Sequence, residues 1–156
     1  MTTPPNGLVV RPDGEGLAVP NAAPGADMIV KALHTDTNGA YSLMEWRSAP
    51  GGVWIPPHIH QGAEEAWYVL EGELTFRVDD RTMLATAGSF VLVPRGAPHS
   101  FANTGSDTAH FLMLFSPGGT ERFFEERAAM RRDAPPGGPD MTALSELSRR
   151  YGIEWV

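Results

Sequence analysis

The sequence predicts an all-β fold, a barrel or sandwich of short strands followed by short C-terminal helices. The first observation is a high content of turn-forming residues, with 17 Gly and 14 Pro in a chain of 156 residues. The second is that short apolar stretches alternate regularly with these turn residues, which is typical of small sandwiches and barrels. The third is the chain length, which suits one domain with a single core.

The strands are expected in the central region, residues 27–116. Residues 1–26 are rich in Pro, Gly and Asn, so we expect an extended arm there, with one short strand at Leu8–Val10. Turns such as Thr37–Gly39 and Glu71–Gly72 separate the strands. The strands expected in the central region are Met28–His34, Tyr41–Ser48, Ala66–Leu70, Leu74–Val78, Thr82–Ala85, Phe90–Val93 and Ala109–Phe115.

The last segment, residues 117–156, changes to helical patterns. A first helix is expected from Thr120 to Arg132, with Glu125, Glu126 and Arg127 on a solvated face. A Pro- and Gly-rich loop follows. Apolar residues at helical spacing then predict a second helix, with Asp140 or Thr142 as its N-cap. These residues are Met141, Leu144, Leu147 and Tyr151. We expect the two helices to cover part of the barrel.

Composition argues against several kinds of partner. The net charge is −7, so neither nucleic acid nor an anionic membrane is expected to bind by bulk electrostatics. There is no Cys, which excludes disulfides and thiolate metal sites. The N-terminal residues lack the pattern of a signal peptide, and no apolar run is long enough for a membrane span. The expected location is cytoplasmic.

Histidines and a carboxylate form a candidate metal site. His58 and His60 lie two apart, so in a strand both imidazoles point to the same face. A strand that begins at Glu65 places its carboxylate on the face of Trp67, an apolar residue suited to the interior. Glu65 is therefore the preferred ligand, and Glu64 is the alternative. Without further support, such histidines are also compatible with hydrogen-bonded residues of a barrel wall.

A third imidazole, that of His99, follows the turn-rich stretch Pro94–Pro98, which can redirect the chain toward the same site. Three imidazoles and one carboxylate suit Fe, Mn, Ni, Co, Cu or Zn, and they disfavour Mg and Ca. Four protein ligands on a metal that prefers five or six leave positions open for a substrate or O₂.

The spacing of these residues resembles the two motifs of the cupin superfamily. The first stretch reads Gly52, five residues, His58-x-His60, four residues, Glu65, six residues, Gly72. The second reads Gly88, five residues, Pro94-x-Gly96, two residues, His99, three residues, Asn103. The resemblance covers residues 28–115 and implies a double-stranded β-helix, or jelly-roll, barrel. It also implies one divalent transition metal per chain on His58, His60, Glu65 and His99, and a homodimer, with the N-terminal arm a candidate for exchange between subunits.

Within this superfamily the chain is similar to small proteins described as quercetin 2,3-dioxygenase-like, through the stretch Trp67–Glu73 and the endings Phe123–Glu126 and Arg150–Glu154. This similarity implies a metal-dependent dioxygenase of a phenolic or enolisable small molecule, with Glu65 as ligand and as candidate base. Two alternatives remain. One is a non-redox cyclase, isomerase or lyase of the polyketide-cyclase-like type, and the other is a non-catalytic module that binds a small molecule.

Five further residues are candidates for the substrate pocket, although core packing or wall hydrogen bonding is the commoner role for such side chains. They are Trp46, Trp54, Trp67, Phe101 and His110.

Overall fold

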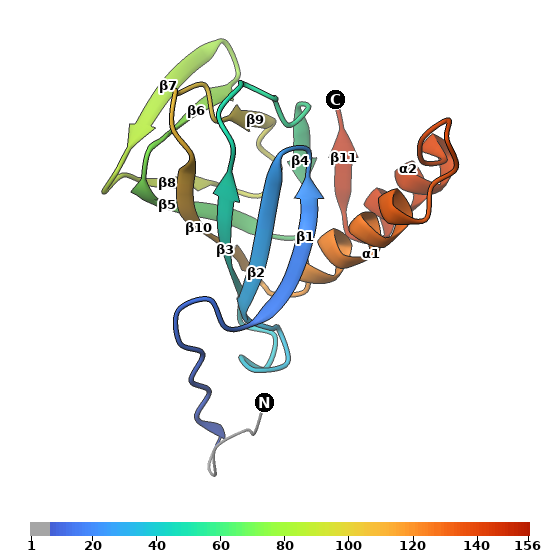
Figure 1. The fold of residues 1–156 in the computed structure, drawn as a ribbon, viewed down its shortest axis with the longest axis horizontal. Coiled ribbons are helices and arrows are strands. Elements are labelled where there is room, and N and C mark those ends of the chain that lie inside the picture. Colours follow the sequence, from blue (N-terminus) through green and yellow to red (C-terminus); the bar gives the residue numbers. More distant parts are fainter. Residues whose placement is uncertain (1–6) are drawn as a thin grey trace.

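The computed structural model describes residues 7–156 and consists of two antiparallel β-sheets with two helices at one side (Figure 1). The larger sheet has the strand order β1-β2-β3-β10-β5-β8, and the smaller has the order β11-β4-β9-β6-β7. The larger sheet is built from β1 (Leu17–Ala23), β2 (Ala26–Ala32), β3 (Ser42–Ser48), β10 (Ala109–Ser116), β5 (Glu64–Glu71) and β8 (Phe90–Val93). The smaller is built from β11 (Ile153–Trp155), β4 (His58–His60), β9 (His99–Ala102), β6 (Glu73–Val78) and β7 (Arg81–Thr86). The all-β prediction is confirmed.

The core lies between the sheets, because strand alternation sends every second side chain inward. On β10 the buried positions alternate strictly, and the buried apolar side chains include Phe111, Met113 and Phe115. On β5 the inward side chains are Glu65, Trp67 and Val69, and each is at most 2% exposed. A carboxylate thus shares the inward face of a strand with core residues.

The N-terminal region differs from the sequence prediction. Residues 8–10 form no strand; instead β1 lies at Leu17–Ala23 and pairs with β2 in the same chain. Pro20 argues against a strand in the sequence, but β1 is the edge of its sheet, where a missing N–H is tolerated. Part of the expected arm therefore belongs to the larger sheet.

The two expected helices are confirmed as α1 (Glu121–Arg132) and α2 (Met141–Arg150). The side chain of Asp140 caps α2 by accepting hydrogen bonds from the backbone N–H groups of Thr142 and Ala143. Helix α1 contacts β1, and α2 contacts α1 and β11. The short strand β11 was not expected; it pairs antiparallel with β4. Among the described residues, no helix is long and apolar enough to cross a membrane.

The first residue of α1, Glu121, ties the helix to the larger sheet. Its fully buried carboxylate accepts hydrogen bonds from the backbone N–H and the ring Nδ1 of His34, at 2.8 and 2.6 Å. It also accepts from the Ser42 hydroxyl and, at 2.9 Å, from the Gly119 N–H. Burial alone raises the pKa of Glu121, but these hydrogen bonds outweigh it and leave the pKa below the usual value.

Candidate metal centre

Four side chains from three strands converge between the two sheets. His58 and His60 come from β4, Glu65 from β5 and His99 from β9. All four residues are at most 5% exposed, and one candidate ligand atom from each lies within 4.8 Å of all the others. The convergence expected from the sequence is therefore present in the fold.

Backbone carbonyl groups orient two of the imidazoles. The ring Nδ1–H of His58 donates to the Pro56 carbonyl at 2.8 Å, and that of His99 donates to the Ala97 carbonyl at 3.0 Å. Such outer hydrogen bonds fix the ring orientation and direct Nε2 toward a shared ligand. The Nε2 atom of His99 lies 2.9 Å from Glu65 Oε2, and that of His60 lies 3.0 Å from the same oxygen.

Strand register explains why these residues meet. His58 on β4 lies directly opposite His99 on β9, and their ring centroids are 4.3 Å apart. The turn after β8 is attached to β4 by a hydrogen bond from the Gly96 N–H to the His60 carbonyl. Gly96 has a φ of 82°, a conformation that favours glycine. The chain is thereby redirected so that β9 begins with its imidazole beside β4.

Alternation along β5 also separates the two glutamates. Glu65 points inward, whereas Glu64 points outward and is not part of the cluster. Glu64 instead forms a bidentate ion pair with Arg95, with both N–O distances at 2.9 Å. Strand alternation alone therefore predicts the inward orientation of Glu65 and the outward orientation of Glu64.

Electrostatics in the cluster favours an ionised carboxylate among histidines. Burial raises the pKa of Glu65, but His60 and His99 outweigh burial and lower it to about 2. Burial is the main reason that the pKa of His58 falls to about 4. For His99, burial lowers the pKa, but Glu65 more than compensates and the net shift is upward. The chain therefore offers an anionic oxygen and a neutral His58 near neutral pH.

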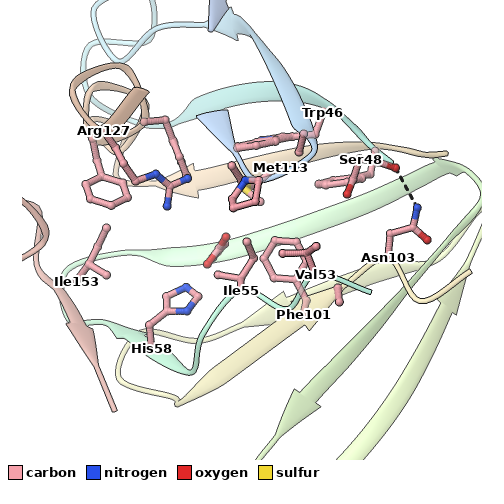
Figure 2. Close-up of a pocket in the computed structure, with 18 of the residues that line it drawn as sticks. Trp46, Ser48, Val53, Ile55, His58, Phe101, Asn103, Met113, Arg127 and Ile153 are labelled. Carbon is pink, nitrogen blue, oxygen red and sulfur yellow. Dashed lines mark hydrogen bonds between the residues drawn. The ribbon is translucent and has the colours of Figure 1, made fainter. Parts of the chain in front are cut away.

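A largely apolar cavity opens from the cluster (Figure 2). The expected pocket residues Trp46 and Phe101 lie on its wall. Other apolar side chains that line it are Val53, Ile55, Phe111, Met113, Phe123, Phe124, Ile153 and Trp155.

The other three expected pocket residues lie elsewhere. Trp67 is a core residue, 1% exposed, whose ring packs against Phe76 and the ring of His99. Trp54 lines a neighbouring outer cavity, where its ring stacks on the guanidinium of Arg77 at 3.8 Å. His110 lies on the opposite face of β10 from the core, and its Nε2 is 2.7 Å from a carboxylate oxygen of Glu45.

One residue of the cavity, Arg127, was not expected there from the sequence. It was expected on a solvated helix face, but it is 5% exposed and lines the same cavity as the cluster. Its neighbours Glu125 and Glu126 are partly exposed, and Glu126 pairs with Arg150. The available signal was periodicity: Arg127 follows Phe123 by four positions and Phe124 by three, so it shares their buried face.

Comparison with known proteins identifies similar sequences and folds. A family model described as a Cupin domain matches residues 44–115. Protein SchB from Streptomyces halstedii is 34% identical over 63% of this chain and 71% of its own length. Quercetin 2,3-dioxygenase from Bacillus subtilis is 28% identical over 61% of this chain, but the match spans only 28% of that protein. This chain also matches 64% of the length of a polyketide synthase and 47% of the length of an oxalate oxidase. It therefore covers less than two thirds of either relative.

A solved structure gives a similar result for the fold. The polyketide cyclase RemF from Streptomyces resistomycificus superposes with a TM-score of 0.56 and 28% identity, covering 70% of this chain and 78% of the cyclase. The sequence motifs, the two-sheet fold and these matches point to the same family.

Proposed function

Since this chain belongs to the cupin superfamily, we propose that it is a metal-dependent enzyme, an oxygenase of a phenolic or enolisable small molecule. The observation that carries the proposal is the cluster of three imidazoles and one carboxylate at a largely apolar cavity. Cupin relatives with enzymatic names include a dioxygenase and oxalate oxidases.

The donor set fits one divalent transition metal per chain. Two imidazoles are held by backbone carbonyls with Nε2 directed at the cluster, and Glu65 stays ionised at neutral pH. Nitrogen and oxygen donors in this ratio suit Fe, Mn, Ni or Co best, and they also accept Zn or Cu. When bound, such a metal supplies Lewis acidity toward a substrate oxygen and, for redox-active ions, a route to O₂ chemistry.

The surrounding residues would bind and orient the substrate. Trp46, Phe101 and Met113 offer apolar walls that favour a planar, poorly hydrated body and exclude water from the cluster. Glu65, expected as both ligand and base, is better suited to ligation, because a carboxylate with a pKa of about 2 is a weak base at neutral pH.

A non-redox cyclisation or isomerisation is the second candidate. It is favoured by coverage: the match to the polyketide cyclase spans 78% of that chain, whereas the match to the quercetin dioxygenase spans 28% of that protein. The same ligands serve both reactions, since function depends on the pocket rather than the fold. A non-catalytic binding module would bind a ligand without forming product. The homodimer and the cytoplasmic location stay predictions.

Two measurements test the proposed function. Elemental analysis of the purified protein is expected to find one transition metal per chain. Glu65→Gln should weaken metal binding by at least about 100-fold, because loss of an outer hydrogen-bond partner alone costs about 10–100-fold. Glu64→Gln is the matched control and should retain the metal, since Glu64 faces outward. Equal metal content in the two variants would contradict the site.

The reaction type is tested by O₂ uptake with flavonols, β-diketones and catechols, with the metal-loaded protein. Uptake that requires both Glu65 and the metal supports the oxygenase. If substrate is converted at the same rate with and without O₂, and the Zn-loaded protein is fully active, the oxygenase proposal is replaced by the non-redox candidate. Binding without any product under either condition would leave the binding module.

A further inference from the structure

The buried arginine of α1 has no role in the metal cluster, yet it lies in the same cavity. Figure 2 shows its guanidinium pointing into the cavity, on the side of His58. The guanidinium carbon lies 5.0 Å from the ring centroids of both Phe123 and Phe124. These two rings hold the Arg127 side chain in place and shield it from water.

The positive charge of Arg127 is not balanced within residues 7–156. Its one hydrogen bond to these residues runs from an Nη2–H to the carbonyl of Ala22, and its Nε–H is buried without a partner. No Asp or Glu of this part of the chain forms an ion pair with it. Burial, with a smaller contribution from Arg131, lowers the pKa of Arg127 to about 9, so it remains charged at neutral pH. A buried charge without a counter-charge is costly, and the contacts with the two phenyl rings offset only part of that cost.

The buried carboxylates of residues 7–156, unlike Arg127, have several hydrogen-bond partners. Glu121 accepts four hydrogen bonds, and Glu65 lies within hydrogen-bond distance of two imidazoles. Among the buried ionised side chains of residues 7–156, Arg127 is the one with a buried donor, its Nε–H, that has no partner. A second unused donor lies on the same cavity wall, the buried Nε1–H of Trp46.

The approach to the cavity is also positively biased. An outer cavity adjoins the inner one and is lined by Trp54, Arg127 and Arg131, with no acidic residue among its lining side chains. In the inner cavity Glu65 is the one acidic lining residue, and the imidazoles engage it. The described lining therefore attracts an anion, although the whole chain carries a net charge of −7.

We propose that Arg127 binds the carboxylate of a small aromatic or enolisable acid, whose apolar body lies between the cavity walls. A guanidinium offers paired N–H donors that match a carboxylate, and a carboxylate would supply the missing counter-charge. Within the proposed function, on which the orientation of the reacting end rests, this contact would direct the opposite end of the acid toward the metal cluster. Arg127 is then a substrate-binding residue that selects acids over neutral analogues.

The experiment compares acids with their amides, which keep the shape and lose the charge. The probes are benzoate and 2-hydroxybenzoate against benzamide and 2-hydroxybenzamide, with binding followed by calorimetry or by ligand-observed NMR. Wild-type protein should prefer each acid by about 10-fold or more, the scale expected of a charge-assisted hydrogen bond in a dry site. Arg127→Met, which keeps an apolar side chain between the two phenyl rings, should abolish the preference while amide binding is retained. Arg131→Met is the matched control and should change the preference far less.

Metal-free protein and the Glu65→Gln variant separate this inference from the proposed function. A preference that persists without metal, and disappears in Arg127→Met, supports the arginine even if no reaction is found. A preference that requires the metal and is unchanged in Arg127→Met would mean that the acid binds the metal, and would overturn the proposal. Equal binding of acids and amides by the wild type would overturn it as well. If Arg127→Met does not fold, Arg127→Gln and the wild-type comparison decide the matter.

Discussion

Replacement of Glu121 by alanine measures how strongly the helix that carries Arg127 is fixed to the barrel. The substitution removes a buried carboxylate and leaves three donor groups without their acceptor: the backbone N–H and the ring Nδ1–H of His34, and the Ser42 hydroxyl. The Gly119 N–H keeps the Ser42 hydroxyl oxygen as an acceptor. Each buried group left unpaired costs about 1–3 kcal/mol, and loss of one partner from a buried charged network costs about 3–5 kcal/mol in total. We expect the free energy of unfolding to fall by about 3–5 kcal/mol in total, because the costs of neighbouring unpaired groups do not simply add.

This loss converts to a change in melting temperature. The entropy of unfolding is about 2.1 cal/mol/K per residue, or about 0.33 kcal/mol/K for 156 residues. A loss of about 3–5 kcal/mol therefore lowers Tm by about 9–15 °C. Thermal unfolding followed by circular dichroism or calorimetry is the assay. Glu146→Ala, an exposed position on α2, is the control and should stay within about 0.5 kcal/mol of the wild type.

Acid pH provides an internal check on the mechanism. The pKa of Glu121 is below its usual 4.5 in the folded protein, so its stabilising effect is present above that value and is lost as the pH falls through the folded pKa. The difference in Tm between the wild type and Glu121→Ala should therefore shrink in acid. A Tm within about 2 °C of the wild type at neutral pH, or a difference that grows in acid, would refute the reasoning.

Two further predictions concern the metal-free protein and a glycine turn. Burial lowers the pKa of His58 from 6.5 to about 4 in the folded protein, so between these pH values the unfolded chain binds one more proton than the folded chain. The free energy of unfolding of the metal-free protein should therefore rise with pH across this window. In His58→Gln the slope of the free energy of unfolding against pH should be smaller. Gly72→Ala should lower the free energy of unfolding more than Gly88→Ala does. Both glycines have positive φ, and a side chain in that conformation alone costs about 1–2 kcal/mol of stability. A Cβ at Gly72 would in addition lie 2.8 Å from the Thr108 carbonyl oxygen, whereas a Cβ at Gly88 has no neighbour within 4 Å. Equal denaturation midpoints for the two glycine variants would contradict the steric argument.

The parts of the fold that the sequence predicts well depend on local patterns. The expected strands from Tyr41 to Phe115 are bounded by turn residues, and their structural bounds agree within about two residues. The short strands β4 and β9, which carry the three histidines, were not among the expected strands. The inward orientation of Glu65 follows from strand alternation alone, so the phase could be read without a structure. The convergence of His99 with His58 is different, since it depends on pairing between strands about 40 residues apart, and motif spacing rather than local physics indicated it.

The parts that were missed depend on tertiary context. Strand β1 contains a proline that is acceptable only because the strand lies at a sheet edge. Strand β11 has three residues, too few for a periodicity, and exists because β4 offers it a partner. Arg127 was assigned to solvent because a charged residue is normally exposed. The packing of α1 against β1 shows that this face of the helix is covered, in agreement with the helical spacing of Arg127 from Phe123 and Phe124.

The pairing of β11 with β4 affects the order in which the strands around the metal site assemble. The strand that carries His58 and His60 has one neighbour, β9, until residues 153–155 add a second, and Trp155 then lies with its ring 5.3 Å from that of His58. During translation these residues leave the ribosome more than ninety positions after the histidines they support. A nascent chain therefore carries His58 and His60 on an unpaired sheet edge until residues 153–155 have been added. Metal capture should therefore follow the pairing of β11 with β4 rather than precede it.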